Sequence, residues 1–218
     1  MHTNVPGRAP IKLKAFYPSF KWYYPDCELE TKKWFVKAVK PDWTIIDVGA
    51  NIGYYSILFA QLAPKGRVYA IEPTCTYDML RTNLAQYPKL KVRTRKVAMG
   101  DKVGNYKDNI FRIWGKGPET MQYDFITMDE FVKKEKLKRV DAIKIDVDSY
   151  DLEVLKGSVE TIKRFNPFIV VELNAALLKR GQSREEAFEW MRSLGYRSPK
   201  IFDTENYLYK LKKWKPPE

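Results

Sequence analysis

Short apolar, β-branched runs alternate with longer segments of mixed polarity along most of the chain. The runs have the length of strands, and the mixed segments repeat apolar residues at helical spacing. The pattern predicts strands at 44–48, 67–72, 91–97, 142–147 and 168–173. It predicts helices at 53–62, 75–87, 151–165 and 183–194, and a closing antiparallel hairpin of 198–202 with 206–211. Repeated strand–helix units are typical of an α/β protein with a mostly parallel sheet and helices on both faces.

The amino-terminal segment, residues 1–40, does not follow this alternation. It is rich in proline and aromatic residues and is expected to pack across the core. Asp26 is placed to cap a helix at about 27–40. That helix would turn one apolar face inward, formed by Leu29, Val36 and Val39.

A second irregular segment, residues 100–126, carries Gly115, Gly117 and Pro118 between short β-like runs. We interpret it as an insertion at the sheet edge, over the site. A helix is expected to begin at 127 and to continue through the basic run 133–139. Because no repeat or long linker interrupts the chain, we expect a single domain, 41–218. The amino-terminal lead, residues 1–40, is expected to pack on this domain.

Composition and charge narrow the possible partners. The chain has 218 residues, of which 44% are hydrophobic, enough for one α/β domain with modest additions. The formal net charge is +12. Such a field attracts nucleic acid, acidic sugars or a membrane surface, although a solvated lysine-rich surface explains it equally well.

The chain has few cysteine and histidine residues, which are the residues that ligate soft metals or serve as the base of a catalytic triad. Cys27 and Cys75 are the only cysteines, and His2 is the only histidine. This excludes a disulfide framework, a zinc cluster and any histidine-dependent triad. The longest apolar stretch, 52–63, is too short to cross a bilayer, so we expect no transmembrane segment and a cytoplasmic protein.

The turn after the first predicted strand is the most informative segment. Asp47 ends the strand, and Gly49 and Gly53 flank the turn that leads into a helix. The spacing fits neither a dinucleotide loop nor a phosphate loop, and an acid in the turn disfavours phosphate. An acid here suits a ligand with a cationic part, and S-adenosylmethionine has one and lacks phosphate. The alternative is a tight turn that binds nothing.

Further candidate cofactor residues follow the next strands. Glu72 closes the second strand, where an acid accepts hydrogen bonds from ribose hydroxyls. We assign Asp47 to the ammonium of the methionyl group, and the two glycines to close approach of the backbone. Ala98 and Met99 follow the third strand and are expected to form apolar walls around the adenine.

A second polar cluster lies at the fourth strand. In a strand, Lys144, Asp146 and Asp148 point to the same face. The lysine would keep the carboxylates ionised, and an ionised Asp could take the proton of an acceptor hydroxyl. Alternatively Asp146, together with Glu172 and Asn174, could bind Mg²⁺. Capping of the next helix by Asp146 or by Asp151 is compatible with either role.

These motifs resemble the FkbM-type family of S-adenosylmethionine-dependent methyltransferases. The matching blocks are IDVGANIGYYS at 46–56, AIEP at 70–73, TMDEF at 127–131, IKIDVDSYDLEVLKG at 143–157, NP at 166–167 and VEL at 171–173. The resemblance implies a Rossmann-like, seven-stranded sheet with a reversed terminal hairpin, and O-methylation of hydroxyls on sugars or natural products. Carried onto this chain, the cofactor residues are Asp47, Gly49, Asn51, Gly53, Glu72 and Asp146. Pro73, which follows Glu72, is a further candidate cofactor residue.

The chain departs from the family at one loop. Where the family usually has Asp-x-Glu-Gly-x-Glu, this chain has DVDSYD at 146–151. Each Glu-to-Asp change withdraws a carboxylate by about 1.5 Å. Ser149 would be strained by roughly 1–2 kcal/mol if the loop needs a left-handed glycine. The acceptor pocket is therefore expected to differ from that of the family.

Three functions remain open. The first is O-methylation of a hydroxyl-bearing small molecule or glycan. The second is RNA methylation, suggested by the net charge and by the basic runs 91–96 and 210–215, which could grip phosphates and stack bases. The third is a non-catalytic interaction protein that has kept the fold. The sequence does not determine the oligomeric state.

Overall fold

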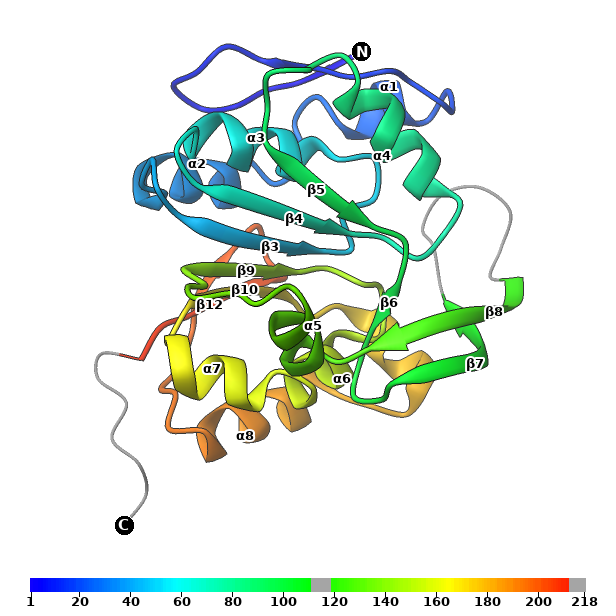
Figure 1. The fold of residues 1–218 in the computed structure, drawn as a ribbon, viewed down its shortest axis with the longest axis vertical. Helices are drawn as coiled ribbons and strands as arrows, with labels where there is room; N and C mark the ends of the chain where they lie inside the picture. Colours follow the sequence, from blue (N-terminus) through cyan, green and yellow to red (C-terminus); the bar gives the residue numbers. More distant parts are fainter. Residues whose placement is uncertain (111–118, 212–218) are drawn as a thin grey trace. The chain divides into compact units, whose positions relative to one another are not determined.

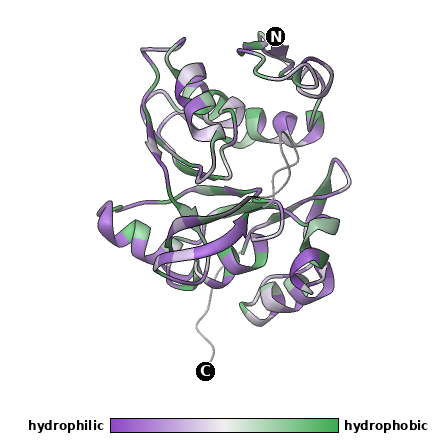
Figure 2. Cartoon of the chain, turned by 90° about the vertical axis from the view of Figure 1, so that its right-hand side faces the viewer, coloured by the Kyte–Doolittle hydropathy of each residue, from purple (hydrophilic) through white to green (hydrophobic). Residues whose placement is uncertain are grey.

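The computed structural model describes residues 1–110 and 119–211. The chain divides into two compact units, Met1–Lys96 and Val97–Glu218, which are described separately. Figure 1 shows the elements of each unit. Apolar and polar residues are interspersed along most helices and strands (Figure 2). No helix within the described ranges is long and apolar enough to cross a membrane.

The first unit is built around three parallel strands, β3 (Thr44–Val48), β4 (Arg67–Ile71) and β5 (Val92–Arg95). β4 pairs with both neighbours, so that Val48 lies opposite Ile71 and Ile71 opposite Arg95. The carboxyl ends of the three strands are therefore level (Figure 1). The connecting helices are α3 (Tyr54–Leu62) and α4 (Thr76–Leu84).

The amino-terminal lead folds onto this unit. It contains the pair β1 (His2–Thr3) and β2 (Ile11–Lys12), followed by α1 (Phe20–Tyr23) and α2 (Leu29–Ala38). α2 packs on α3 through Phe35, whose ring centroid lies 4.7 Å from that of Phe59 and 5.7 Å from that of Tyr55. All residues of α3 except Gln61 are buried, as expected for a helix that is apolar on nearly every side.

The second unit holds four strands of the main fold, in the order β11-β12-β10-β9. β9 (Ala142–Ile145) and β10 (Phe168–Glu172) are parallel, whereas β12 (Asn206–Tyr209) runs antiparallel to β10 and forms a hairpin with β11 (Lys200–Phe202). The helices are α5 (Met128–Lys134), α6 (Asp151–Lys156), α7 (Val159–Phe165), the 3₁₀ helix η1 (Ala175–Arg180) and α8 (Arg184–Ser193). With the three strands of the first unit, these four complete the predicted number of seven. The predicted α/β fold with a mostly parallel sheet and a closing hairpin is confirmed.

A separate three-stranded sheet occupies the predicted insertion. β7 (Gly104–Ile110) and β8 (Glu119–Ile126) form an antiparallel pair, and β6 (Ala98–Met99) lies parallel to β8. The predicted β-like runs are therefore present as strands. Gly115, Gly117 and Pro118, which the prediction also included, lie outside the described residues.

The prediction for the lead helix was wrong in two respects. α2 begins at Leu29 after Glu28, which has a left-handed φ of 48°, and Asp26 instead accepts a hydrogen bond from Asn4. The buried face of α2 also differs from the one that we predicted, since it is formed by Thr31, Lys32 and Phe35. The Lys32 ammonium is fully buried and donates to the Thr3 hydroxyl at 2.8 Å, so a buried polar contact replaces the expected apolar stripe.

Two other predicted helices differ in extent. α5 ends at Lys134, and Lys136 has a left-handed φ of 51°, so the basic run does not continue the helix. The helix predicted at 151–165 is divided into α6 and α7 at Gly157. A Cβ on Gly157 would lie 2.1 Å from the carbonyl oxygen of Gly100, so this contact requires glycine. The predicted division of the chain at residue 40 stays a prediction.

Candidate cofactor and catalytic site

The loop between β3 and α3 turns its backbone N–H groups toward the protein. Gly49 and Ala50 both donate to the carbonyl of Ile71 at 3.0 Å. Asn51 donates to Glu72 Oε2 at 3.0 Å, and Gly53 donates to Ala50 at 2.8 Å. A phosphate site needs N–H groups that face the ligand. This geometry agrees with the sequence prediction that the loop does not bind a dinucleotide.

Left-handed backbone conformations produce the loop. Gly49 and Gly53 have φ values of 82° and 91°, where residues with a Cβ are disfavoured. A Cβ on Gly53 would also lie 2.6 Å from Leu80 Cδ1. Asn51, with φ at 48°, is one of the few non-glycine residue types that adopt this region readily.

Glu72 is 5% exposed, and its carboxylate is anchored on both oxygens. Oε1 accepts from the backbone N–H of Thr74 at 2.9 Å and from its hydroxyl at 2.6 Å, while Oε2 accepts from Asn51. A carboxylate has about four acceptor positions, so Oε2 can accept one further hydrogen bond.

Asn51 offers a second acceptor beside Glu72. Its side-chain oxygen Oδ1 is buried and has no hydrogen-bond partner among the described residues. A buried acceptor without a partner is costly, and a ligand donor would remove that cost. The loop thus presents acceptors rather than donors. This set fits the hydroxyl and ammonium groups of a nucleoside such as S-adenosylmethionine and does not fit a phosphate.

Asp47 lies at the base of the loop and is 1% exposed. Its Oδ2 accepts a hydrogen bond from the Ser56 hydroxyl of α3 at 2.5 Å. The contact joins the end of β3 to the first turns of α3. Asp47 therefore orients the loop, and its predicted contact with a ligand ammonium stays a prediction.

The lead contributes two contacts that the sequence reasoning missed. Tyr54, the first residue of α3, donates its hydroxyl to the carboxylate of Glu28. Asn83 of α4 is fully buried and donates to the loop carbonyl of Ile52 at 2.8 Å, while its oxygen accepts from the backbone of Lys14 at 2.7 Å. These side chains hold the lead against the loop. Their partners are distant in sequence, and no local pattern identifies them.

In the second unit, Lys144 and Asp146 form the ion pair that the sequence predicted. Lys144 is 1% exposed, and its ammonium lies 2.7 Å from Asp146 Oδ2. The side chain of Asp146 is 25% exposed, so one partner is buried and the other is accessible. An accessible carboxylate held by a buried cation can accept a proton from a bound hydroxyl.

Asp148 does not continue the strand, contrary to the prediction. β9 ends at Ile145, and Asp148 has a left-handed φ of 49°. Asp151 organises this turn, since its carboxylate accepts from the backbone N–H groups of Val147 and Ser149 at 3.0 and 3.1 Å. Asp151 is the first residue of α6, and the N-cap residue Tyr150 makes no side-chain capping hydrogen bond, so Asp151 holds the turn before the helix instead of capping it.

Ser149 has the strained backbone that the comparison with the family predicted. It is fully buried and has φ at 118°, a region that favours glycine.

We expect Ser149→Gly to be more stable than Ser149→Ala by about 1–2 kcal/mol. Both variants lose the hydroxyl, but only glycine relieves the backbone. Urea denaturation of the two variants measures the difference. An alanine variant as stable as the glycine variant would show that the turn relaxes without glycine.

Burial raises the pKa of the Asp151 carboxyl to about 7, with a further contribution from nearby Asp146, against the opposing effect of the backbone hydrogen bonds. Because an Asp in the unfolded chain has a pKa near 3.9, the folded protein binds more protons between about pH 4 and pH 7. This contribution to stability is complete below pH 4 and is lost as the pH rises through 7, by about 4 kcal/mol at most.

The measurement is the free energy of unfolding between pH 4 and pH 8 for the wild type and Asp151→Asn. The wild type should lose stability relative to the variant as the pH rises. Asp124→Asn, at an exposed position of β8, is the control. Parallel pH curves for the wild type and Asp151→Asn would contradict the assignment.

The remaining predicted site residues have mixed outcomes. Asn174 donates to Glu172 Oε2 at 2.7 Å, and its oxygen accepts from the backbone of Ala176 at 2.8 Å, which caps η1. The oxygen predicted to bind Mg²⁺ thus already has a structural role.

Ala98 and Met99 are both buried, and Ala98 belongs to an apolar cluster with Phe125 and Tyr150. Pro73 is half-buried beside Glu72. Contact of these residues with a cofactor stays a prediction.

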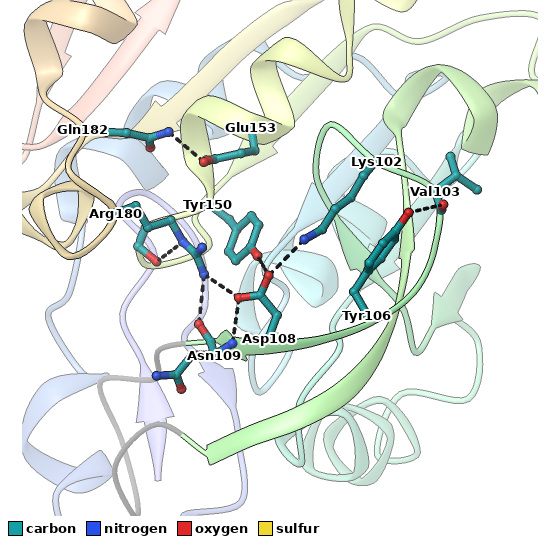
Figure 3. A network of polar contacts seen from close by, with 10 residues as sticks. Lys102, Val103, Tyr106, Asp108, Asn109, Tyr150, Glu153, Arg180 and Gln182 are labelled. Atoms are coloured by element: carbon teal, nitrogen blue, oxygen red, sulfur yellow. Dashed lines mark hydrogen bonds and ion pairs between the residues drawn. The ribbon is translucent and has the colours of Figure 1, made fainter.

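A polar network that the sequence reasoning missed is centred on Asp108 of β7 (Figure 3). Asp108 Oδ2 accepts from the Tyr150 hydroxyl and from the Lys102 ammonium, the latter at 3.0 Å. Its Oδ1 accepts from the backbone of Asn109 at 2.7 Å and from Arg180 Nη2 at 3.3 Å. The network connects the insertion, the turn before α6 and the end of η1.

The contacts of the network set the protonation of its members. Burial alone would raise the pKa of Asp108, but hydrogen bonds from Tyr150, Asn109 and Lys102, with the charge of Arg180, hold it well below its usual value. Burial, together with the hydrogen bond to Asp108, raises the pKa of the Tyr150 hydroxyl above its usual value. Asp108 is therefore ionised and Tyr150 protonated at neutral pH.

The fold described above is the Rossmann-like fold of class I methyltransferases. Residues 47–198, more than half of the chain, match the model of the methyltransferase FkbM domain. The chain belongs to this family.

Three named methyltransferases are similar to this chain over part of their length. Hexuronic acid methyltransferase AglP of Haloferax volcanii is 26% identical over 157 residues, which are 69% of this chain and 64% of the relative. Methyltransferase sdnD of Sordaria araneosa is 26% identical over 59% of this chain and 65% of its own length. The 2-O-methyltransferase NoeI of Sinorhizobium fredii is 26% identical over 66% of this chain and 68% of its own length. The matches therefore span slightly less than two thirds of the first two relatives.

Solved structures share the fold at low identity. Methyltransferase FkbM from Methylobacillus flagellatus has a TM-score of 0.59 and 16% identity, over 79% of this chain and 44% of that chain. A Streptococcus mutans protein in complex with S-adenosylhomocysteine has a TM-score of 0.52 and 11% identity, over 85% of this chain and 99% of that chain. At such identities the likeness concerns the fold alone.

Proposed function

We propose that the chain is an S-adenosylmethionine-dependent O-methyltransferase that acts on a hydroxyl of a sugar or a small natural product. The observation that carries the proposal is the acceptor-lined loop of the first unit. The N–H groups of Gly49, Ala50, Asn51 and Gly53 donate within the protein, while Glu72 Oε2 and the buried Asn51 Oδ1 remain able to accept. Membership of a methyltransferase family supports the same conclusion.

Glu72 and Asp47 keep the roles that the sequence predicted, and we add Asn51 as an acceptor beside Glu72. Glu72 and Asn51 receive the hydroxyl groups of the ribose, and Asp47 with its Ser56 contact holds the loop and attracts the ammonium. Gly49 and Gly53 allow the backbone to approach the ligand. The full proposed set is Asp47, Gly49, Asn51, Gly53, Glu72, Pro73, Ala98, Met99 and Asp146. When bound, S-adenosylmethionine supplies an electrophilic methyl group on a cationic sulfur.

The proposed catalytic residues are Asp146, Lys144 and Asp148. Asp146 accepts the proton of the acceptor hydroxyl, which increases the nucleophilicity of the oxygen. Lys144 fixes the position of this carboxylate through the 2.7 Å ion pair. Asp148, in the following turn, contacts the acceptor. Alignment of the reacting atoms supplies up to roughly 7–11 kcal/mol, so positioning contributes more than base catalysis.

The acceptor class is inferred from the relatives. Two of them are named for a hexuronic acid and for a 2-O position, which supports a hydroxyl on a sugar. Mg²⁺ is left out of the proposal, because the oxygen of Asn174 already caps η1.

Incubation with methyl-labelled S-adenosylmethionine and panels of glycans, small natural products and RNA tests the proposal. Label on a glycan or small-molecule oxygen is the expected result. Label on RNA alone would favour the alternative suggested by the basic run 91–96, in which Lys91, Arg93, Arg95 and Lys96 are exposed. In that case RNA binding should fall steeply with salt. Of the other basic run, 210–215, the residues from 212 onward lie outside the described residues.

A further inference from the structure

We propose that Arg180 and Lys102 form a subsite for a carboxylate on the acceptor, so that the preferred acceptors are anionic sugars. The inference rests on the proposed function and names its substrate class. It starts from the network around Asp108 (Figure 3), whose residues all belong to the second unit. None of them was assigned a role above.

Arg180 is held in a fixed orientation with donor capacity to spare. Its guanidinium carbon lies 3.5 Å from the centroid of the Tyr150 ring. Nε donates to Ser149 Oγ at 3.2 Å, and Nη2 donates to the Asn109 carbonyl at 2.9 Å and to Asp108. Within the described ranges, Nη1 has no hydrogen-bond partner, and the side chain is 19% exposed. A planar, oriented guanidinium is the usual partner of a carboxylate.

Lys102 is the second cation of the subsite. Its ammonium lies 3.0 Å from Asp108 Oδ2, and 4.4 and 4.7 Å from the ring centroids of Phe125 and Tyr106. An ammonium has three donors, and the side chain is 33% exposed. Asp108 thus positions two cations with a single negative charge. Glu153 is turned toward Gln182, which donates to it at 2.7 Å (Figure 3).

An apolar surface accompanies the two cations. The Tyr106 side chain is 41% exposed on β7, next to Lys102. Ligand sites combine aromatic walls with a few charged or polar groups that fix orientation. The ring of a sugar has apolar C–H faces, which the Tyr106 ring can cover. The carboxylate of the same sugar can then contact Arg180 and Lys102.

The subsite is connected to the proposed catalytic carboxylate through one turn of the chain. Arg180 contacts Ser149 and Tyr150, which follow Asp146 by three and four residues. A carboxylate bound by Arg180 therefore holds the acceptor beside this turn. Rigid placement of an acceptor at a distance from the reacting hydroxyl is how binding energy contributes to rate.

The test compares uronic-acid methyl glycosides with their neutral hexose counterparts. Binding is measured by isothermal titration in the presence of S-adenosylhomocysteine, and methyl transfer is measured in parallel. We expect the uronic acids to bind roughly 10–150-fold more tightly, as for a charge-assisted hydrogen bond. Arg180→Gln and Lys102→Gln should each reduce this preference, because each should lose more affinity for the uronic acids than for the neutral sugars.

Arg192→Gln, at a surface pair with Glu189 on α8, is the control and should retain the preference. Melting curves of each variant identify any that fails to fold, and Lys102→Gln then replaces Arg180→Gln. Equal affinity for acidic and neutral sugars, no binding of either, or a preference that survives in both variants would overturn the inference. Failure of the proposed function is seen separately, as an absence of S-adenosylmethionine binding by the same samples.

Discussion

Glu72→Gln should weaken the binding of S-adenosylmethionine by roughly 10–150-fold, the range for one charge-assisted hydrogen bond. The carboxylate accepts three hydrogen bonds, from Asn51 and from two groups of Thr74. A glutamine has one acceptor oxygen, so its amide nitrogen must face a donor. The variant therefore loses both the ligand contact and the support of the loop. Isothermal titration measures the dissociation constant.

Glu189→Gln provides a matched control, since Glu189 is an exposed acid of α8 that pairs with Arg192 at 3.8 Å. It should bind the cofactor like the wild type. A melting curve of Glu72→Gln checks that the fold is retained. Wild-type affinity in a folded Glu72→Gln protein would show that the ribose does not contact this carboxylate.

Asp146→Asn should reduce turnover by about 10²–10⁴-fold, the usual contribution of a general base. The amide cannot take the proton of the acceptor hydroxyl. Because the amide of asparagine can still form a hydrogen bond with a hydroxyl, the variant should retain most of its affinity for the acceptor. Initial rates with saturating cofactor measure the effect, which is expected in kcat rather than in KM.

The ion pair with Lys144 complicates this variant, because Lys144 is buried. Removal of one partner of a buried pair typically costs about 3–5 kcal/mol. The double variant Lys144→Met/Asp146→Asn removes both charges and should recover stability without recovering activity. Recovered activity in the double variant, or wild-type turnover in a folded single variant, would exclude Asp146 as the base.

The strand–helix alternation was predictable because local patterns determine it. β3 has the predicted bounds, and β4, β9 and β10 each end one or two residues before the predicted end. The acids at the carboxyl ends of the strands were found for the same reason, since Asp47, Glu72 and Asp146 directly follow or close apolar runs. The Lys144–Asp146 pair follows from the two-residue period of a strand.

Contacts between distant segments were not predictable. Arg180 and Asp108 are 72 residues apart in sequence, and no pattern near either indicates that they meet. Glu28 has a left-handed backbone, and α2 begins after it instead of at residue 27 as predicted. The helix predicted at 151–165 is divided at Gly157, which lies against Gly100. In each case a tertiary contact or an unusual backbone angle overrode the local propensity.

The strained turn at Ser149 illustrates what the family comparison added. Local propensity does not indicate a φ of 118° at a serine, but the family has a glycine at this position. The departure from the family therefore coincides with a strained backbone. The same turn contacts Arg180, so the part of the chain that differs from the family lies beside the proposed acceptor subsite.

The central claim is that the loop after β3 and the carboxylate after β4 bind the nucleoside of S-adenosylmethionine. A crystal structure of the protein grown with S-adenosylhomocysteine tests it most directly. We predict ribose oxygens within hydrogen-bond distance of Glu72 Oε2, with Asn51 Oδ1 satisfied by the ligand. Clear density for the nucleoside at any other position, with Glu72 and Asn51 left without ligand contacts, would contradict the account.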